Sequence, residues 1–175
     1  MLRLELITMN NFNEALKLQN EIFPEYNGKN NYLDSFKEES RLRFFLIYDD
    51  NLFVGLSGIY CYKNDYDNAW LGFFGIKEEF RNKGYGKLAL LLTEEYAKSE
   101  GYKFMRLFTD KYDNDLAISF YKKYGYVFED YNSDLEELKD SFCVVIGSKS
   151  ISDYKVTPWN NRFINLSKQT IKQQY

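Results

Sequence analysis

The sequence predicts an α/β fold with a mixed sheet. Its 175 residues suffice for one domain with a sizeable hydrophobic core, so we expect a single domain over residues 1–175. Short stretches with strand-like alternation or continuous apolar character are interspersed with stretches whose apolar residues recur at helical spacing. Their order, β-α-α-β-β-β-α-β-α-β-β, is typical of an α/β domain.

The first elements are a strand and two helices. Residues 2–7 alternate apolar and polar side chains, as a half-buried strand does. Residues 10–23 place apolar side chains on one helical face, and Pro24 ends that helix. The polar residues 25–31 indicate a loop, and residues 32–40 are compatible with a second short helix.

Three strands are expected next. Residues 43–48 and 52–62 are rich in apolar and aromatic residues, and the turn residues 49–51 between them predict a hairpin. Residues 63–68 are polar and turn-like. The apolar run at residues 69–76 then predicts a buried strand.

The second half alternates helices and strands. Residues 85–99 and 114–124 show helical periodicity, with Gly101 and Gly125 just past their ends and Asn114 as the expected N-cap of the second. The remaining predicted strands are at residues 103–109, 126–130 and 142–146, with a short helical insert at 133–140.

The C-terminal residues 150–175 form a more polar extension, which we expect to be helical in part. Thr157 and Pro158 suit a cap and first helical position. Apolar and small side chains then share one face, namely those of Trp159, Phe163, Leu166 and Thr170. This segment could shape a substrate cleft or a homodimer interface.

Composition excludes several classes of function. A net charge of −3 gives no basic footprint for nucleic acid, and no segment is apolar enough for a signal peptide or membrane span, so we expect a cytoplasmic protein without a membrane partner. The chain has no His, which excludes Ser-His-Asp chemistry and most transition-metal sites. Cys61 and Cys143 are unpaired in sequence and fit buried apolar positions, so no metal site is expected. With 16 Tyr, a single tyrosine is weak evidence for a site.

The most informative segment precedes the helix at residues 85–99. Gly84 and Gly86 stand two apart in a loop that also carries Arg81, Lys83 and Lys87. Glycine lets the backbone approach a ligand closely, and the N–H groups at a helix N-terminus attract anions. The loop therefore predicts a phosphate or pyrophosphate site, although a cationic turn without a ligand would show the same spacing.

Two well-known phosphate motifs fit this loop less well. A P-loop needs Ser or Thr after Lys87, where this chain has Leu88. The Rossmann pattern G-x-G-x-x-A does match residues 84–89, and Asp110 could contact a ribose. However, that pattern begins directly after a strand, whereas the charged residues 77–83 intervene here.

A third pattern fits best. Residues 81–86, Arg-Asn-Lys-Gly-Tyr-Gly, resemble the R/Q-x-x-G-x-G/A signature of GNAT acetyltransferases, in which loop amides hold the pyrophosphate of coenzyme A. Residues 114–126 resemble the second signature of that family, N-x-x-A-x-x-F/L-Y-x-x-x-G-F/Y. The two occur in the family's order and separation, and the resemblance covers about residues 2–147. It implies the GNAT fold, a central mixed and mostly antiparallel sheet flanked by helices.

The resemblance implies roles for individual residues. Gly75 and Ile76 match the fourth strand, whose backbone pairs with the pantetheine arm and orients the acetyl carbonyl. Asn114 would contact that arm where two central strands splay. Tyr121 would protonate the leaving thiolate, which suits a phenol that is neutral at pH 7. The loop residues expected to bind pyrophosphate are Arg81, Asn82, Lys83, Gly84, Tyr85, Gly86 and Lys87.

Some of these roles have alternatives. Tyr121 could instead be a core residue on the helical face of Ala117, Phe120 and Tyr124. Many family members also carry a glutamate base on the fourth strand, and residues 69–76 contain none. The candidate bases are Glu21, Glu25 and Asp110, each of which could equally be a surface carboxylate.

A further departure is the acidic pair Glu78 and Glu79, where many family members have Pro at the first position. These carboxylates would weaken the positive field of the loop unless they point outward.

The resemblance implies an acetyl-CoA-dependent N-acetyltransferase that acts by direct attack in a ternary complex. The acceptor would be a primary amine of a small molecule or a peptide. The missing strand carboxylate leaves a non-catalytic acyl-CoA sensor as one alternative. The overlap with the Rossmann pattern leaves a nucleotide-binding oxidoreductase as another.

Overall fold

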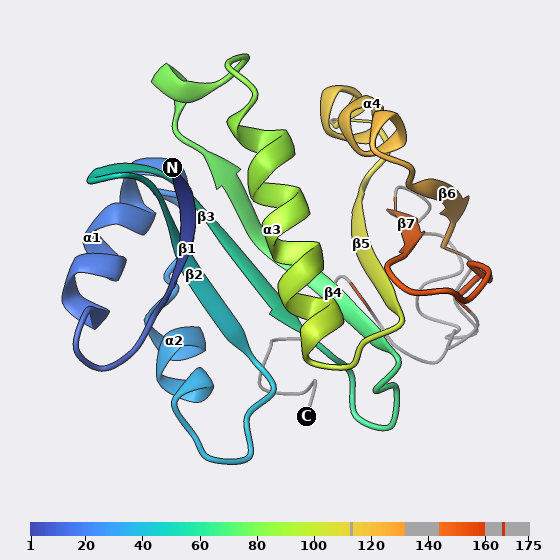
Figure 1. Cartoon of the computed structure of the whole chain (residues 1–175), viewed down its shortest axis with the longest axis horizontal. Coiled ribbons are helices and arrows are strands. Elements are labelled where there is room, and N and C mark those ends of the chain that lie inside the picture. Colours follow the sequence, from blue (N-terminus) through green and yellow to red (C-terminus); the bar gives the residue numbers. More distant parts are fainter. Residues whose placement is uncertain (113, 132–143, 160–165, 167–175) are drawn as a thin grey trace.

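A computed structural model describes residues 1–112, 114–131, 144–159 and 166. Seven strands form one sheet in the order β1-β2-β3-β4-β5-β7-β6 (Figure 1). Among the described pairings, only β4 with β5 is parallel. The strands are β1 Leu2–Leu6, β2 Arg43–Asp49, β3 Leu52–Tyr60, β4 Asn68–Ile76, β5 Phe104–Asp110, β6 Val127–Asp130 and β7 Val144–Ser150. The helices are α1 Phe12–Ile22, α2 Lys29–Ser35, α3 Tyr85–Ser99 and α4 Asp115–Lys123, with a 3-10 turn η1 at Glu78–Phe80. The predicted order of elements and the mixed α/β class are confirmed.

Helices cover both faces of the sheet. Successive side chains of β2 point to opposite faces, as the pleat requires. Phe44 and Leu46 pack in a core with Ala15 of α1, whereas Ile47 packs with Ala89 of α3 on the other face. In Figure 1, α3 lies in front of the sheet and α4 lies beside the upper end of β5.

The two central strands separate partway along their length. β4 pairs with β5 from Asn68 to Trp70, and no pairing between them follows in the described residues. Against β3, the register places Leu56 opposite Gly75 and Gly58 opposite Gly72. Two residues of β4 therefore face one residue of β3, which is a β-bulge and bends the strand.

Phe73 lies in this bulge and has a φ of 51°. A positive φ is unusual for an aromatic residue and is held in place by the surrounding packing. The bulge separates two neighbouring aromatic side chains: Phe73 packs with the α1–α2 core, and Phe74 contacts Phe120 and Tyr121 of α4.

The second helix begins and ends earlier than the predicted range 32–40. It spans Lys29–Ser35 because Asn27 Oδ1 accepts a hydrogen bond from Lys29 N at 3.1 Å, an Asx turn that starts the helix. At its end, Ser35 Oγ donates to the Tyr32 carbonyl at 2.6 Å. Such side-chain bonds compete with continuation of the helix.

The last strand is longer than predicted at its C-terminal end. It was expected at residues 142–146 and spans Val144–Ser150, with residues 142–143 and the expected insert at 133–140 outside the described residues. Its polar end is a strand because β5 pairs with it along one side as far as Ser150, while β6 pairs with the other.

The prediction of a helix beginning at Thr157 and Pro158 is wrong for the described residues, because residues 155–159 have no regular structure. Their backbone forms tertiary hydrogen bonds instead. The Thr157 carbonyl accepts from Arg106 Nη1 at 3.0 Å, and Trp159 N donates to Glu129 Oε1 at 2.9 Å. The rest of the expected helix lies outside the described residues, except for the buried Leu166.

The composition also led to expectations about the cysteines, membrane spans and metal sites. Cys61 is buried in the core, as predicted, and Cys143 lies outside the described residues. Within the described ranges, no helix is long and apolar enough to cross a bilayer. The same part of the chain contains no group of three His, Cys, Asp or Glu side chains placed to hold a metal ion.

Alkaline pH should destabilise this protein through its buried tyrosines. Burial raises the phenol pKa of each above its ordinary value near 10, so above pH 10 these phenols ionise in the unfolded chain and stay protonated in the folded one. The unfolded state then binds fewer protons, and the free energy of unfolding should fall by up to about 1.4 kcal/mol per pH unit for each such tyrosine. Urea titrations at pH 9, 10 and 11 measure this, and a constant unfolding free energy would contradict it. The tyrosines are Tyr32, Tyr60, Tyr62, Tyr102 and Tyr126.

Candidate functional site

A cleft of about 1000 Å³ opens at the end of β4, between the N-terminus of α3 and helix α4. The end of α1 also contributes to its wall through Ile22 and Phe23. Most of the residues singled out from the sequence line this one cleft. They are Gly75, Ile76, Arg81, Asn82, Gly84, Gly86, Lys87, Asn114 and Tyr121.

The open edge of β4 faces the cleft at Ile76. Lys77 N donates to the Val54 carbonyl at 2.9 Å, so the neighbouring pair of Ile76 and Gly55 is a non-hydrogen-bonded pair of the antiparallel ladder. The N–H and carbonyl of Ile76 therefore point away from β3, toward the side on which β5 has separated. Arg81 Nε donates a hydrogen bond to the Ile76 carbonyl at 3.0 Å. The Ile76 N–H remains at the open edge.

The loop before α3 presents backbone N–H groups. Asn82 has a φ of 60° and Gly84 a φ of 87°, so the loop turns through two left-handed residues. Gly84 is the N-cap of α3, and no side chain caps the helix there. The first N–H groups of α3 thus lack intrahelical partners, and such groups suit an anion. Gly86 and Phe120 face each other across the cleft. A Cβ added at Gly86 would lie 3.4 Å from the Phe120 ring, so the glycine leaves room between them.

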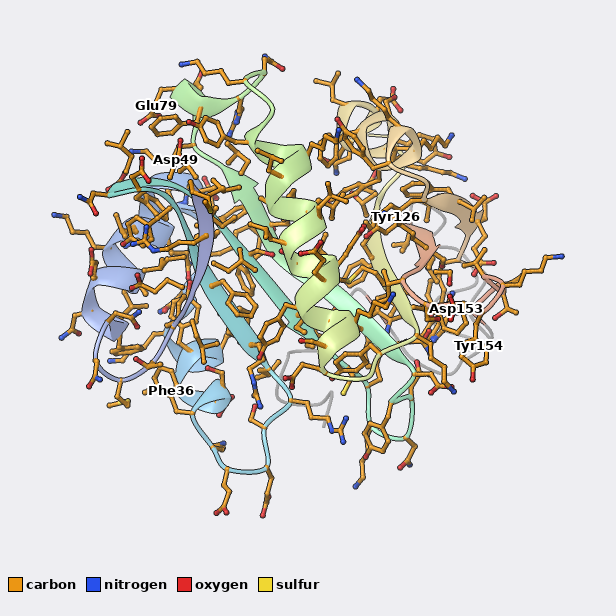
Figure 2. The ribbon with its side chains drawn as sticks, viewed as in Figure 1. Phe36, Asp49, Glu79, Tyr126, Asp153 and Tyr154 are labelled. Carbon is orange, nitrogen blue, oxygen red and sulfur yellow. The ribbon has the colours of Figure 1, made fainter. Side chains whose placement is uncertain are left out.

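Cations outnumber carboxylates along the described lining of the cleft. Arg81, Lys87 and Lys123 line it, and Asp115 is the one carboxylate among its described residues. Glu79 instead pairs with Lys77, whose Nζ lies 2.8 Å from its Oε1, and this cation lowers the pKa of the Glu79 carboxyl. Figure 2 shows Glu79 on the outer side of η1, away from α4.

Two residues of the expected loop set do not line the cleft. Lys83 Nζ lies 5.9 Å from the centroid of the Phe80 ring. Tyr85 donates its hydroxyl hydrogen bond to Asp49 Oδ2 at 2.8 Å, which ties the start of α3 to the end of β2. Both were expected to act through backbone amides. The Tyr85 side chain anchors the loop to β2, whereas the Lys83 side chain is exposed.

Helix α4 forms the opposite wall. Asn114 occupies the N-cap position, as predicted, but its side chain makes no cap hydrogen bond and instead lines the cleft. Tyr121 lines the cleft and is also partly packed, with its ring centroid 5.2 Å from that of Phe120 and 5.3 Å from that of Tyr126. Burial raises the pKa of the Tyr121 hydroxyl above its ordinary value. Tyr121 therefore both lines the cleft and packs among neighbouring aromatic rings, the two alternatives considered from the sequence.

The carboxylates considered as general bases lie elsewhere. Glu21 Oε2 is 3.0 Å from Lys77 Nζ, and Asp110 Oδ1 accepts a hydrogen bond from Tyr112 N at 2.7 Å. Neither these two nor Glu25 lines the cleft. Sequence reasoning missed several lining residues, although helical spacing from Tyr121 would have indicated Tyr124. The missed residues include Ile22, Phe23, Phe74, Asp115, Phe120, Lys123 and Tyr124.

The family model for the acetyltransferase (GNAT) family matches residues 12–126. The chain belongs to the GNAT acetyltransferase family. No curated protein sequence matches the chain. The predicted family and the predicted GNAT fold are both confirmed.

Solved GNAT acetyltransferases share the fold at low sequence identity. The ribosomal-protein-S18-alanine N-acetyltransferase from Escherichia coli is 13% identical with a TM-score of 0.65, covering 91% of this chain and 100% of its own. PaiA N-acetyltransferase from Thermoplasma acidophilum, solved with coenzyme A, is 18% identical with a TM-score of 0.61, covering 83% and 98%. A GNAT family acetyltransferase from Elizabethkingia anophelis, solved with acetyl-CoA, is 18% identical with a TM-score of 0.63, covering 85% and 97%.

Proposed function

We propose that this GNAT protein transfers the acetyl group of acetyl-CoA to a primary amine by direct attack in a ternary complex. The observation that carries the proposal is the composition of one cleft. A cationic loop with unpaired amides, an open strand edge at Ile76 and the hydroxyl-bearing side chain of Tyr121 all line it. Together these three features suit an acyl thioester that carries a pyrophosphate.

The co-substrate would lie along the cleft in an extended form. The N–H groups from Asn82 to Lys87 would bind the pyrophosphate, supported by the guanidinium and ammonium groups of the same loop. Arg81 was also expected to offer its N–H, but that group donates to the Glu78 carbonyl at 3.1 Å. Gly75 and the Ile76 N–H would pair with the pantetheine arm, and Asn114 would contact that arm from α4. Solved relatives that hold coenzyme A or acetyl-CoA support this choice of co-substrate.

The reaction needs three things from the chain. The amine nitrogen forms a bond to the thioester carbonyl carbon while the carbon–sulfur bond breaks, and a backbone N–H near Ile76 would stabilise the developing oxyanion. Tyr121 would donate its proton to the departing sulfur. Because none of the carboxylates considered as bases, Glu21, Glu25 and Asp110, lines the cleft, we assign loss of the ammonium proton to solvent water.

A non-catalytic acyl-CoA-binding module is the second candidate. The absence of a carboxylate from β4, over Asn68–Ile76, favours it. It predicts binding of acetyl-CoA without release of the coenzyme A thiol in a broad panel of primary amines. Thiol release with any of these amines would exclude it in favour of the enzyme.

Gly86→Val should weaken acetyl-CoA binding at least about tenfold. The Cβ of the new side chain would lie 3.4 Å from Phe120, and its methyl groups would fill the cleft beside the loop. A tenfold loss of affinity corresponds to about 1.4 kcal/mol. Titration calorimetry with acetyl-CoA measures the change in dissociation constant.

Glu95→Val is the matched control for this experiment. It places the same β-branched residue at an exposed position of α3, away from the cleft. It should bind acetyl-CoA like the wild type. Equal affinity in all three proteins would mean that the ligand does not occupy this cleft. Binding of NAD or NADP with indifference to acetyl-CoA would overturn the proposed function itself.

A further inference from the structure

An aromatic cluster lies beside the acetyl end of the cleft. Phe23, Tyr26 and Phe73 are mutually edge-to-face, with centroid separations of 6.2, 6.2 and 6.3 Å. Phe23 belongs to both this cluster and the wall of the cleft. It also lies against Gly75, since a Cβ there would be 2.7 Å from the Phe23 ring. The cluster is therefore continuous with the strand edge at Ile76.

The loop that carries Tyr26 is held in one position. Gln19 is 1% exposed, and its Nε2 donates to the Tyr26 carbonyl at 2.6 Å. Its Oε1 lies where a Cβ of Gly28 would be, at 1.7 Å, so only glycine fits there. Tyr26 itself is 61% exposed, so its ring adds little to the core. The buried amide of Gln19 thus holds the backbone that carries an exposed aromatic ring, and a preformed recognition surface needs such support.

Phe73 supports the same interpretation. It is the bulge residue with a φ of 51°, a conformation that aromatic residues avoid. The bulge directs its ring toward Phe23, Tyr26 and Phe44. Unusual backbone conformations persist where packing holds them and often mark functional positions.

The charges near this cluster do not suit a polycation. On α1, Glu21 pairs with Lys77, and the one carboxylate of the described cleft lining, Asp115, begins α4. In the loop that carries Tyr26, Glu25 is the single carboxylate. A polyamine needs several carboxylates to replace the water around its ammonium groups. A ring, in contrast, can extend the edge-to-face array of Phe23, Tyr26 and Phe73.

We propose that Phe23, Tyr26 and Phe73 form the acceptor subsite and that the acceptor is an arylalkylamine, whose ring packs on this cluster while its single amine reaches the thioester. The inference rests on the proposed acetyl transfer. Binding of the co-substrate alone would not require this aromatic cluster, whereas binding of an aromatic acceptor would.

The test compares three amines with acetyl-CoA in excess: 2-phenylethylamine, ethylamine and spermidine. The wild type should have a kcat/KM for 2-phenylethylamine about 10- to 100-fold above that for ethylamine, the effect of burying one ring. Spermidine should be the poorer substrate. Tyr26→Ala should raise the KM for 2-phenylethylamine up to about tenfold and the KM for ethylamine by a smaller factor.

Tyr154→Ala is the matched control. Its ring is 58% exposed, close to that of Tyr26, and Figure 2 shows it far from the N-terminal end of α3. It should change no constant. A preference for spermidine, or an equal loss for ethylamine and 2-phenylethylamine in Tyr26→Ala, would overturn the acceptor assignment. If calorimetry detects no acetyl-CoA binding, the proposed function fails as well; if it detects binding without acceptance of 2-phenylethylamine, only the assignment of this subsite falls.

Discussion

Trp159→Ala should lower the free energy of unfolding by about 3–5 kcal/mol, the range for truncating a fully buried tryptophan. The side chain is 2% exposed. Its ring centroid lies 4.8 Å from that of Trp70 and 5.9 Å from that of Tyr62. Its Nε1 donates to Asp65 Oδ2 at 2.9 Å. The variant would lose the packing and leave a carboxylate, whose pKa burial already raises, without one of its donors.

Two further variants separate these contributions in urea titrations followed by circular dichroism. Trp159→Phe keeps most of the apolar area but removes the donor to Asp65, so it should cost about 1–3 kcal/mol. Tyr154→Ala changes an exposed ring in the same segment and should stay within about 0.5 kcal/mol of the wild type. A loss below about 1 kcal/mol in Trp159→Ala would mean that this segment does not dock on the sheet in solution.

The parts of the fold that sequence reasoning predicted depend on local signals. Gly101 and Gly125 end α3 and α4 with φ values of 91° and 92°, which glycine adopts without strain. The GNAT signatures placed the cleft-lining loop and Tyr121 on their correct elements for a similar reason. Each is a short contiguous pattern whose residues need only their neighbours to be interpreted.

The parts that were mispredicted depend on contacts between distant residues. Thr157 and Pro158 look like a helix start. The backbone of Thr157 and of Trp159 instead bonds to Arg106 and Glu129, which no local pattern indicates. The bulge at Phe73 is equally hidden, because it arises from the register of β4 against β3. The cluster of Phe23, Tyr26 and Phe73 therefore became visible only in the folded chain.

Tyr121→Phe should reduce kcat about 100-fold or more, as expected for removal of a general acid. The variant keeps the ring and its contacts with Phe74, Phe120 and Tyr126, so the wall of the cleft should remain in place. The dissociation constant for acetyl-CoA should change by less than about twofold, since no step of binding uses the hydroxyl. Pre-steady-state measurement of thiol release, with calorimetry for binding, distinguishes the two constants.

The pH dependence sharpens this test. Burial raises the pKa of the Tyr121 hydroxyl above 10, so the proton remains available throughout the neutral and moderately alkaline range. The wild type should therefore lose no activity through this group below pH 10. Tyr124→Phe removes a hydroxyl from the next turn of the same cleft wall and should leave kcat unchanged. If Tyr121→Phe retains full turnover, the ring serves only to pack α4 against β4, and the thiolate takes its proton from water.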